Sequence, residues 1–273
     1  METTTRYLST LERALWLLTF FDIKSPKWRV SDLSRQTGIS KSTVSRMLQT
    51  MEKHDFIEKD IVTGQYGLGV RFLEFAAVVS YGQDLRRCAQ NEMSWLVNET
   101  GECVILTVHS SGEAVCIDKR DSSRPVHITY LVGGRASLHA GASGKILAAF
   151  MNPTDIERFI KEKGLYRYTD KTIVDPDEFR KDLERIRQQG YAVTCGELDS
   201  GIMAVAAPIF NNESQIAGGL SVVCLPERLD TVLDEIVEKT KKAANQISLK
   251  MGFRMNANIS VNSSVAGISS QGK

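Results

Sequence analysis

The segment from Ser31 to Met51 constrains the fold of this chain most strongly. It reads SDLSRQTGISKSTVSRMLQTM. Gly38 suits a tight left-handed turn between two short helices, and Ser40 is a typical cap for the second of them. Small Ser34 stands where the two helices would approach each other. Apolar residues at helical spacing would bury the corner between the helices: Leu33, Ile39, Val44 and Leu48. The segment therefore predicts a helix-turn-helix.

The second helix of this motif would show solvent a row of short polar and basic side chains. Hydroxyl groups and helix N-terminal amides bond phosphates, whereas Arg and Gln reach base edges in the major groove. An ordinary surface helix rich in Ser and Lys is the alternative interpretation. The pattern favours DNA binding, and the candidate contact residues are Ser40, Lys41, Ser42, Thr43, Ser45, Arg46 and Gln49.

The charge of the chain is unevenly distributed along the sequence. The net charge is only +1 over 273 residues, which excludes a basic nucleic-acid coat over the whole surface. Between Lys24 and Lys53, however, seven bases stand against two acids, an excess of five positive charges, so the remainder carries −4. This local excess is the footprint expected of a site-specific DNA-binding domain.

Hydrophobic periodicity divides the chain into two domains. A helix over 8–21, the helix-turn-helix and two strands at 56–58 and 65–68 form a winged DNA-binding domain over 1–69. A linker helix over 70–83 follows, interrupted by Gly82. The second domain spans 84–252, and a tail rich in Asn, Ser and Gly over 253–273 is predicted to be disordered.

The second domain alternates strands and helices in an α+β pattern. It opens with a helix over 84–100 and a hairpin around Gly112. The further expected strands are 126–131, 191–194, 203–210 and 215–223. The further expected helices are 142–151, 153–163, 176–189 and a long last helix from Pro226 to about Met251.

Several classes of protein are excluded or disfavoured. No run of 18 apolar residues occurs, and the N-terminus lacks a signal-peptide pattern, so we expect no membrane partner and a cytoplasmic location. Five scattered cysteines favour reduced thiols over disulfides, metal ligands or a Cys224 nucleophile. The ASGK stretch at 142–145 fits neither a phosphate loop nor a nucleophile elbow. We expect no cofactor, no metal and no enzymatic activity.

Motifs along nearly the whole chain resemble those of the IclR family of bacterial transcriptional regulators. They are STLERALWLL at 9–18, the helix-turn-helix, YGLG at 66–69, LHAGASGKILAA at 138–149, QGYAV at 189–193, MAVAAPIF at 203–210 and GGLSV at 218–222. The resemblance implies a winged helix-turn-helix and a GAF-like effector-binding domain with a mainly antiparallel sheet. It also implies a homodimer or homotetramer on a palindromic operator in double-stranded DNA. A small organic acid or aromatic metabolite would set operator affinity, with repression or activation as the outcome.

The resemblance also implies an effector site in the second domain. The loop at Gly141, Ala142 and Ser143 would meet the ligand, because amides at a helix start hold a carboxylate. The other implied contacts are Tyr130, Ala204, Ser221 and Val223. This sequence departs from the family pattern at three positions. Val223 replaces a second common serine, Thr194 stands where some members carry aspartate, and Ala204 stands where some carry cysteine. These departures predict a more apolar pocket, for a larger or aromatic carboxylic acid.

Structural roles remain open for several of these residues. Ser143 could only cap its helix, Ser221 could be a core hydroxyl, Tyr130 could belong to core or pocket, and His139 is expected to be structural. Two alternative functions remain open for the chain as a whole. One is a small-acid-binding enzyme or accessory protein whose helix-turn-helix contacts protein, and the other is an architectural DNA-binding protein without an effector.

Overall fold

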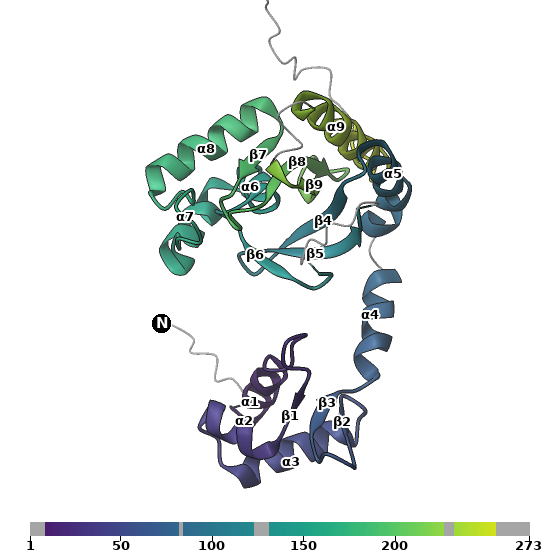
Figure 1. Cartoon of the computed structure of the whole chain (residues 1–273), viewed down its shortest axis with the longest axis vertical. Coiled ribbons are helices and arrows are strands. Elements are labelled where there is room, and N and C mark those ends of the chain that lie inside the picture. Colours follow the sequence, from purple (N-terminus) through teal and green to yellow (C-terminus); the bar gives the residue numbers. More distant parts are fainter. Residues whose placement is uncertain (1–8, 82–83, 123–130, 227–231, 255–273) are drawn as a thin grey trace, which may run out of the picture. The chain divides into compact units, whose positions relative to one another are not determined.

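The computed structural model describes residues 9–81, 84–122, 131–226 and 232–254. The chain divides into two compact units, Met1–Gln83 and Asp84–Lys273, which are described separately (Figure 1).

The first unit is a small three-stranded sheet with helices. Its elements are α1 (Ser9–Leu18), β1 (Lys27–Trp28), α2 (Val30–Thr37), α3 (Lys41–Glu52), β2 (Ile57–Lys59), β3 (Tyr66–Leu68) and α4 (Arg71–Tyr81). The antiparallel strands lie in the order β1-β3-β2. The predicted elements are all present, although α1 ends at Leu18 rather than at residue 21. Strand β1 was missed, because two residues are too few to show an alternating pattern.

The turn between α2 and α3 has the geometry that the sequence predicts. Gly38 adopts φ 69°, and its N–H donates to Ser34 O at the end of α2. Ser40 Oγ accepts from the N–H of Thr43 at 3.3 Å, which caps α3. The hydroxyl of Ser34 donates to Ile39 O at 2.6 Å, so it links α2 to the turn that precedes α3.

The core of the first unit lies beneath this corner. Leu33, Val44 and Leu48 are fully buried, and Ile39 packs at the edge of the same cluster. Met47, which is absent from the predicted set of apolar residues, is also buried, and Met51 is half-buried. The opposite face of α3 is thereby turned to solvent.

The second unit is a six-stranded antiparallel sheet between two layers of helices. Its strands are β4 (Cys103–Ser110), β5 (Glu113–Arg120), β6 (Arg135–Ser137), β7 (Ala192–Cys195), β8 (Met203–Phe210) and β9 (Ile216–Cys224). They lie in the order β6-β5-β4-β9-β8-β7. The helices are α5 (Asp84–Thr100), α6 (Ala142–Ala149), α7 (Pro153–Lys163), α8 (Pro176–Gln189) and α9 (Leu233–Lys250).

Each face of this sheet has its own hydrophobic core, because neighbouring residues of a strand point to opposite faces. Ile105 joins Ile146 and Phe179 in the core beneath α6, α7 and α8. Val104 and Leu106 join the core beneath α5 and α9. Figure 1 shows these two groups of helices on either side of the sheet.

Two expected elements differ from the structure. The strand expected at 126–131 falls almost wholly outside the described residues, and the third strand that the structure does describe is β6, at Arg135–Ser137. The last helix begins at Leu233 rather than at Pro226. In addition, Phe253, at the start of the predicted tail, packs its ring against Phe210 at a centroid distance of 5.3 Å.

We predict that Leu48→Ala lowers the free energy of unfolding of the first unit by about 2–5 kcal/mol, because Leu48 is fully buried and Ala leaves a cavity. Denaturant titration followed by the fluorescence of Trp28, in the same core, measures this change. Gln49→Ala on the exposed side of the helix is the matched control. Equal stability of the two variants would contradict the predicted packing of α3.

Candidate nucleic-acid interface and effector pocket

The predicted DNA-contact residues lie together on and before the first two turns of α3. Ser40, Lys41, Ser42, Arg46 and Gln49 are exposed, and Thr43 and Ser45 are half-buried. The buried stripe of Val44, Met47 and Leu48 faces the other way. The helix therefore presents a continuous polar face, as direct reading of a major groove requires.

Hydroxyl groups cluster at the N-terminus of α3. Ser40 Oγ lies 3.1 Å from Ser42 Oγ and 2.9 Å from Thr43 Oγ1. Ser40 thus has a structural role as the cap. The positive end of the helix dipole and these hydroxyls together make a favourable place for a phosphate.

The cations of α3 are available to a polyanion. Across the described part of the chain, neither Lys41 nor Arg46 has an ion-pair partner. Arg35 on α2, in contrast, is paired with Asp32 at 2.5 Å. Charges that are free of internal partners cost less to transfer to DNA phosphates or base edges.

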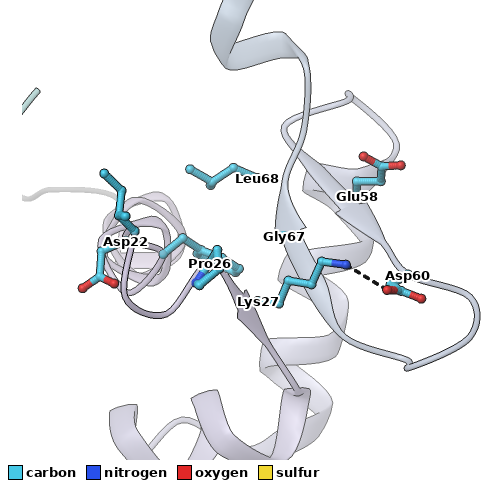
Figure 2. A pocket seen from close by; sticks show the side chains of 9 residues that line it. Asp22, Pro26, Lys27, Glu58, Asp60, Gly67 and Leu68 are labelled. Atoms are coloured by element: carbon cyan, nitrogen blue, oxygen red, sulfur yellow. Dashed lines mark hydrogen bonds and ion pairs between the residues drawn. The ribbon is translucent and has the colours of Figure 1, made fainter. Parts of the chain in front are cut away.

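The hairpin formed by β2 and β3, which is the predicted wing, is stabilised by an aspartate in its turn. Asp60 Oδ1 accepts from the N–H groups of Val62 and Thr63, both at 3.0 Å. Asp60 Oδ2 pairs with Lys27 Nζ at 2.9 Å, as Figure 2 shows. The hydrogen bond from Lys27 and those from the turn amides lower the pKa of Asp60 far below its ordinary value.

A groove of about 560 Å³ lies beside this ion pair. Its lining includes apolar Ile23 and Leu68 and the acids Asp22 and Glu58. Figure 2 shows Leu68 and the two acids. Carboxylates repel phosphates, so this groove is a poor surface for DNA. The exposed face of α3 is the better one.

The second unit contains a cavity of about 370 Å³ at the N-terminus of α6. Five of the seven predicted effector residues line it: Gly141, Ala142, Ser143, Ala204 and Val223. The remaining lining residues are Ile105, Ala136, Ala140, Gly144, Thr194, Glu197, Leu198, Asp199 and Ile202. The predicted set is therefore brought together by α6, β8 and β9.

The other two predicted residues differ from this group. Ser221 shares a face of β9 with Val223, but it is fully buried under α6 and does not line the cavity. Ser143 Oγ donates to Ser221 Oγ at 2.8 Å, so Ser221 orients a lining hydroxyl. Direct contact of Ser221 with a ligand is thus not supported. Tyr130 lies outside the described residues.

Residues of β7 and the loop after it also line the cavity, and sequence reasoning missed most of them. Thr194 was noted as a departure from the family pattern, whereas Glu197, Leu198 and Asp199 carried no signal. Loop residues show no periodicity, and no motif marks them. Their charges nevertheless decide the electrostatics of the cavity.

The N-terminus of α6 has two amides occupied and two available. Gly141 N–H donates to Glu197 Oε2 at 3.3 Å, and Ala142 N–H donates to Thr194 Oγ1 at 2.9 Å. No acceptor for the amides of Ser143 and Gly144 occurs among the described residues. These two backbone donors can hold a carboxylate.

Lys145 is buried and does not line the cavity. Its Nζ lies 2.7 Å from Glu197 Oε1 and 2.8 Å from Asp182 Oδ2 on α8. Burial raises the pKa of Asp182, but hydrogen bonds and charge from Lys145 and Arg185 lower it more, so the net pKa lies below its ordinary value. The lysine of the ASGK stretch is therefore a structural cation rather than a phosphate ligand.

His139 is structural, as the sequence predicts. It is fully buried, with Nδ1 2.6 Å from Ser137 Oγ and Nε2 2.8 Å from Tyr166 O. Because a carbonyl only accepts, Nε2 carries the proton and Nδ1 accepts from the hydroxyl. Burial lowers the pKa of His139, in keeping with a neutral ring.

The alternative chemistries gain no support from the described residues. Burial raises the pKa of the Cys224 thiol to about 12, which makes it a poor nucleophile. No cluster of three potential metal ligands occurs in the described ranges. No helix found there is long and apolar enough to cross a membrane.

Comparisons with known proteins find matches to both regions of the chain. Residues 10–60 match the IclR helix-turn-helix domain, and residues 77–249 match the family described as bacterial transcriptional regulator IclR C-terminal. The HTH-type transcriptional regulator KipR of Bacillus subtilis is 34% identical over 245 residues, which is 89% of this chain and 97% of KipR. The transcriptional repressor IclR of Escherichia coli is 26% identical, covering 91% of this chain and 92% of that protein.

Solved structures show the same fold. An IclR-type regulator from Alicyclobacillus acidocaldarius has a TM-score of 0.80 and 25% identity over 90% of this chain and 100% of that one. An IclR homologue from Microbacterium hydrocarbonoxydans, solved in complex with 4-hydroxybenzoate, has a TM-score of 0.79 and 26% identity over 89% of this chain and 98% of that one.

These relatives are named as transcriptional regulators, which agrees with the expectation that the chain is not an enzyme and does not favour the accessory-protein alternative. The matches extend over both units of the chain. This chain therefore belongs to the IclR family of bacterial transcriptional regulators and binds DNA through its N-terminal helix-turn-helix.

Proposed function

We propose that this regulator is ligand-responsive, with the operator read by α3 and the operator affinity set by a small carboxylic acid in the α6 cavity. The observation that carries the proposal is the cavity itself, which combines an apolar lining with two amide donors free for an anion. A ligand shifts operator affinity only if it binds the DNA-competent and DNA-incompetent states unequally.

Arg46 is the proposed base- or phosphate-contacting residue at the centre of the exposed face of α3. It is exposed, makes no ion pair with a described residue, and lies one turn from the hydroxyl cluster at Ser42 and Thr43. A guanidinium in this position can donate to a guanine edge or to a phosphate.

We predict that Arg46→Ala weakens operator binding by about 1–3 kcal/mol, as expected for the loss of one such contact. Gel shifts at several salt concentrations, on duplexes recovered by genomic selection with the purified protein, measure the loss. If the slope of the logarithm of the binding constant against the logarithm of the salt concentration falls by about 1, Arg46 contacts a phosphate. If that slope is unchanged and the sequence preference is relaxed, Arg46 contacts a base. Arg158→Ala, an exposed arginine of the second unit, is the control. Unchanged operator affinity would remove Arg46 from the interface.

The cavity favours an acid of moderate size with an apolar body. Its volume of about 370 Å³ lies within the range of about 300–1,000 Å³ that small-molecule sites occupy. Ala136, Ala204 and Val223 contribute apolar side chains to the same lining as Ser143 and Gly144. The Microbacterium homologue in complex with 4-hydroxybenzoate supports an aromatic acid as one candidate class.

We predict that a small organic acid found in a thermal-shift screen raises the melting temperature of the full chain, and that Ser143→Ala reduces this shift, because Ser143 lines the cavity at the start of α6. Ser221→Ala should have a smaller effect, since its hydroxyl only orients that of Ser143. Operator binding without ligand should persist in both variants. A screen without a stabilising acid, or a full shift in Ser143→Ala, would contradict the assignment.

We further propose that the chain acts as a homodimer, in which two copies of α3 read two half-sites of a palindrome. The first unit exposes apolar side chains on two of its helices. On α1 these are Leu11, Leu15 and Trp16, and on α4 they are Leu73, Phe75 and Val78. Leu73 is 73% exposed, which is unfavourable in a monomer and favourable in an interface.

We predict that Leu73→Asp shifts the protein toward the monomer in sedimentation velocity and weakens binding to a two-half-site duplex, because a charge in an apolar interface is desolvated without a partner. The control is Leu249→Asp, an exposed leucine of α9. A dimer that persists in Leu73→Asp would exclude the face of α4 that carries Leu73 as an interface.

A further inference from the structure

The cavity at α6 has an unusual charge for a site that receives an acid. The charged residues of its lining are Glu197 and Asp199, both acidic, and its described lining contains no lysine or arginine. Asp199 is exposed at the rim, whereas the side chain of Glu197 is only 13% exposed. Glu197 is therefore the charge that a bound ligand meets in a poorly solvated space.

The cation behind Glu197 does not cancel this charge fully. Lys145 is shared between Glu197 and Asp182, so the buried group of three carries a net charge of −1. Arg185 pairs with Asp182, but its side chain is 54% exposed and contacts the far carboxylate of the group. With Arg185 counted the group is neutral, but among the described residues Lys145 is the one cation in contact with Glu197, and it divides its charge between Glu197 and Asp182.

Glu197 is held in place by both its backbone and its side chain. Its carbonyl accepts from Thr172 Oγ1 at 2.6 Å, and Oε2 accepts from the N–H of Gly141 at 3.3 Å. With Oε1 bound to Lys145 at 2.7 Å, the carboxylate is tied to both the start and the first turn of α6. It does not swing away to admit a second anion without breaking these bonds.

From this geometry we infer that Glu197 is a specificity-determining residue, which restricts the effector to monocarboxylic acids and rejects dicarboxylic acids of similar size. The inference rests on the proposed acid-binding function. One carboxylate is stabilised by the free amides of Ser143 and Gly144 and by the α6 dipole. A second carboxylate would find no such donor and would lie near the fixed charge of Glu197, where repulsion is weakly screened.

The test is isothermal calorimetry on the full chain with paired probes, which are benzoate with terephthalate and propionate with succinate. The wild-type protein should bind at least one monoacid about tenfold or more tightly than its diacid partner, the effect of roughly 1.4 kcal/mol of repulsion. Glu197→Gln keeps the shape and an acceptor for Gly141 but removes the charge. It should tighten binding of the monoacid and tighten binding of the diacid more strongly. The ratio of the two dissociation constants for that pair should therefore approach 1.

Three further variants separate charge from structure. Glu197→Asp keeps the charge and should keep the monoacid preference, even if it lowers affinity overall. Thr172→Val removes the hydrogen bond to the carbonyl of Glu197, in the loop after β7, without changing the charge. It should weaken binding of the monoacid and of the diacid by the same factor. Glu184→Gln, at a 57% exposed acid of α8 outside the cavity, should leave the ratio as in the wild type.

The outcomes are distinct for the two proposals. Equal binding of a monoacid and its diacid by the wild type, or an unchanged ratio in Glu197→Gln with a melting temperature near that of the wild type, would overturn the role of Glu197. If Glu197→Gln fails to fold, loss of the monoacid preference in the charge-retaining Glu197→Asp overturns it instead. Failure of all four probes to bind either protein would overturn the acid-effector proposal itself, and this inference with it.

Discussion

The buried ammonium of Lys145 holds together the parts of the second unit that form the cavity. It joins the first turn of α6 to Asp182 on α8 and to Glu197 in the loop after β7. Removing a charge from water is costly, and only close carboxylate partners offset that cost in a protein interior. The three elements are therefore tied to one another, because the buried ammonium of α6 would be unpaired without the carboxylates of the other two.

The same arrangement gives the start of α6 two roles. Two of its amides donate to the protein itself, to Glu197 and Thr194. Those of Ser143 and Gly144, which line the cavity, have no acceptor among the described residues. Close packing supports this division, since a Cβ on Gly144 would lie 2.2 Å from Ser137 O. The helix start is thus pressed against the chain before it, so its free donors are positioned before a ligand arrives.

Sequence reasoning succeeded where the signal was local. The turn at Gly38, the cap at Ser40 and the buried face of α3 all follow from residue types within about twenty positions. Most strands and helices of the second unit were also predicted to within a few residues. It failed for β1 and β6, which have two and three residues, and for the start of α9. Short strands owe their existence to pairing with distant partners, which no local pattern records.

By itself, the sequence determined the helix-turn-helix, the family and the position of the cavity at Gly141–Ser143, because these depend on contiguous motifs. Tertiary structure decided which side chains face that cavity. It buried Ser221 behind Ser143, brought in Glu197 from more than fifty residues away, and bound Lys145 to Glu197 outside the cavity lining. The physical reason is that the charge and shape of a cavity belong to all the elements packed around it, and their meeting is set by the sheet order and the buried ion pairs.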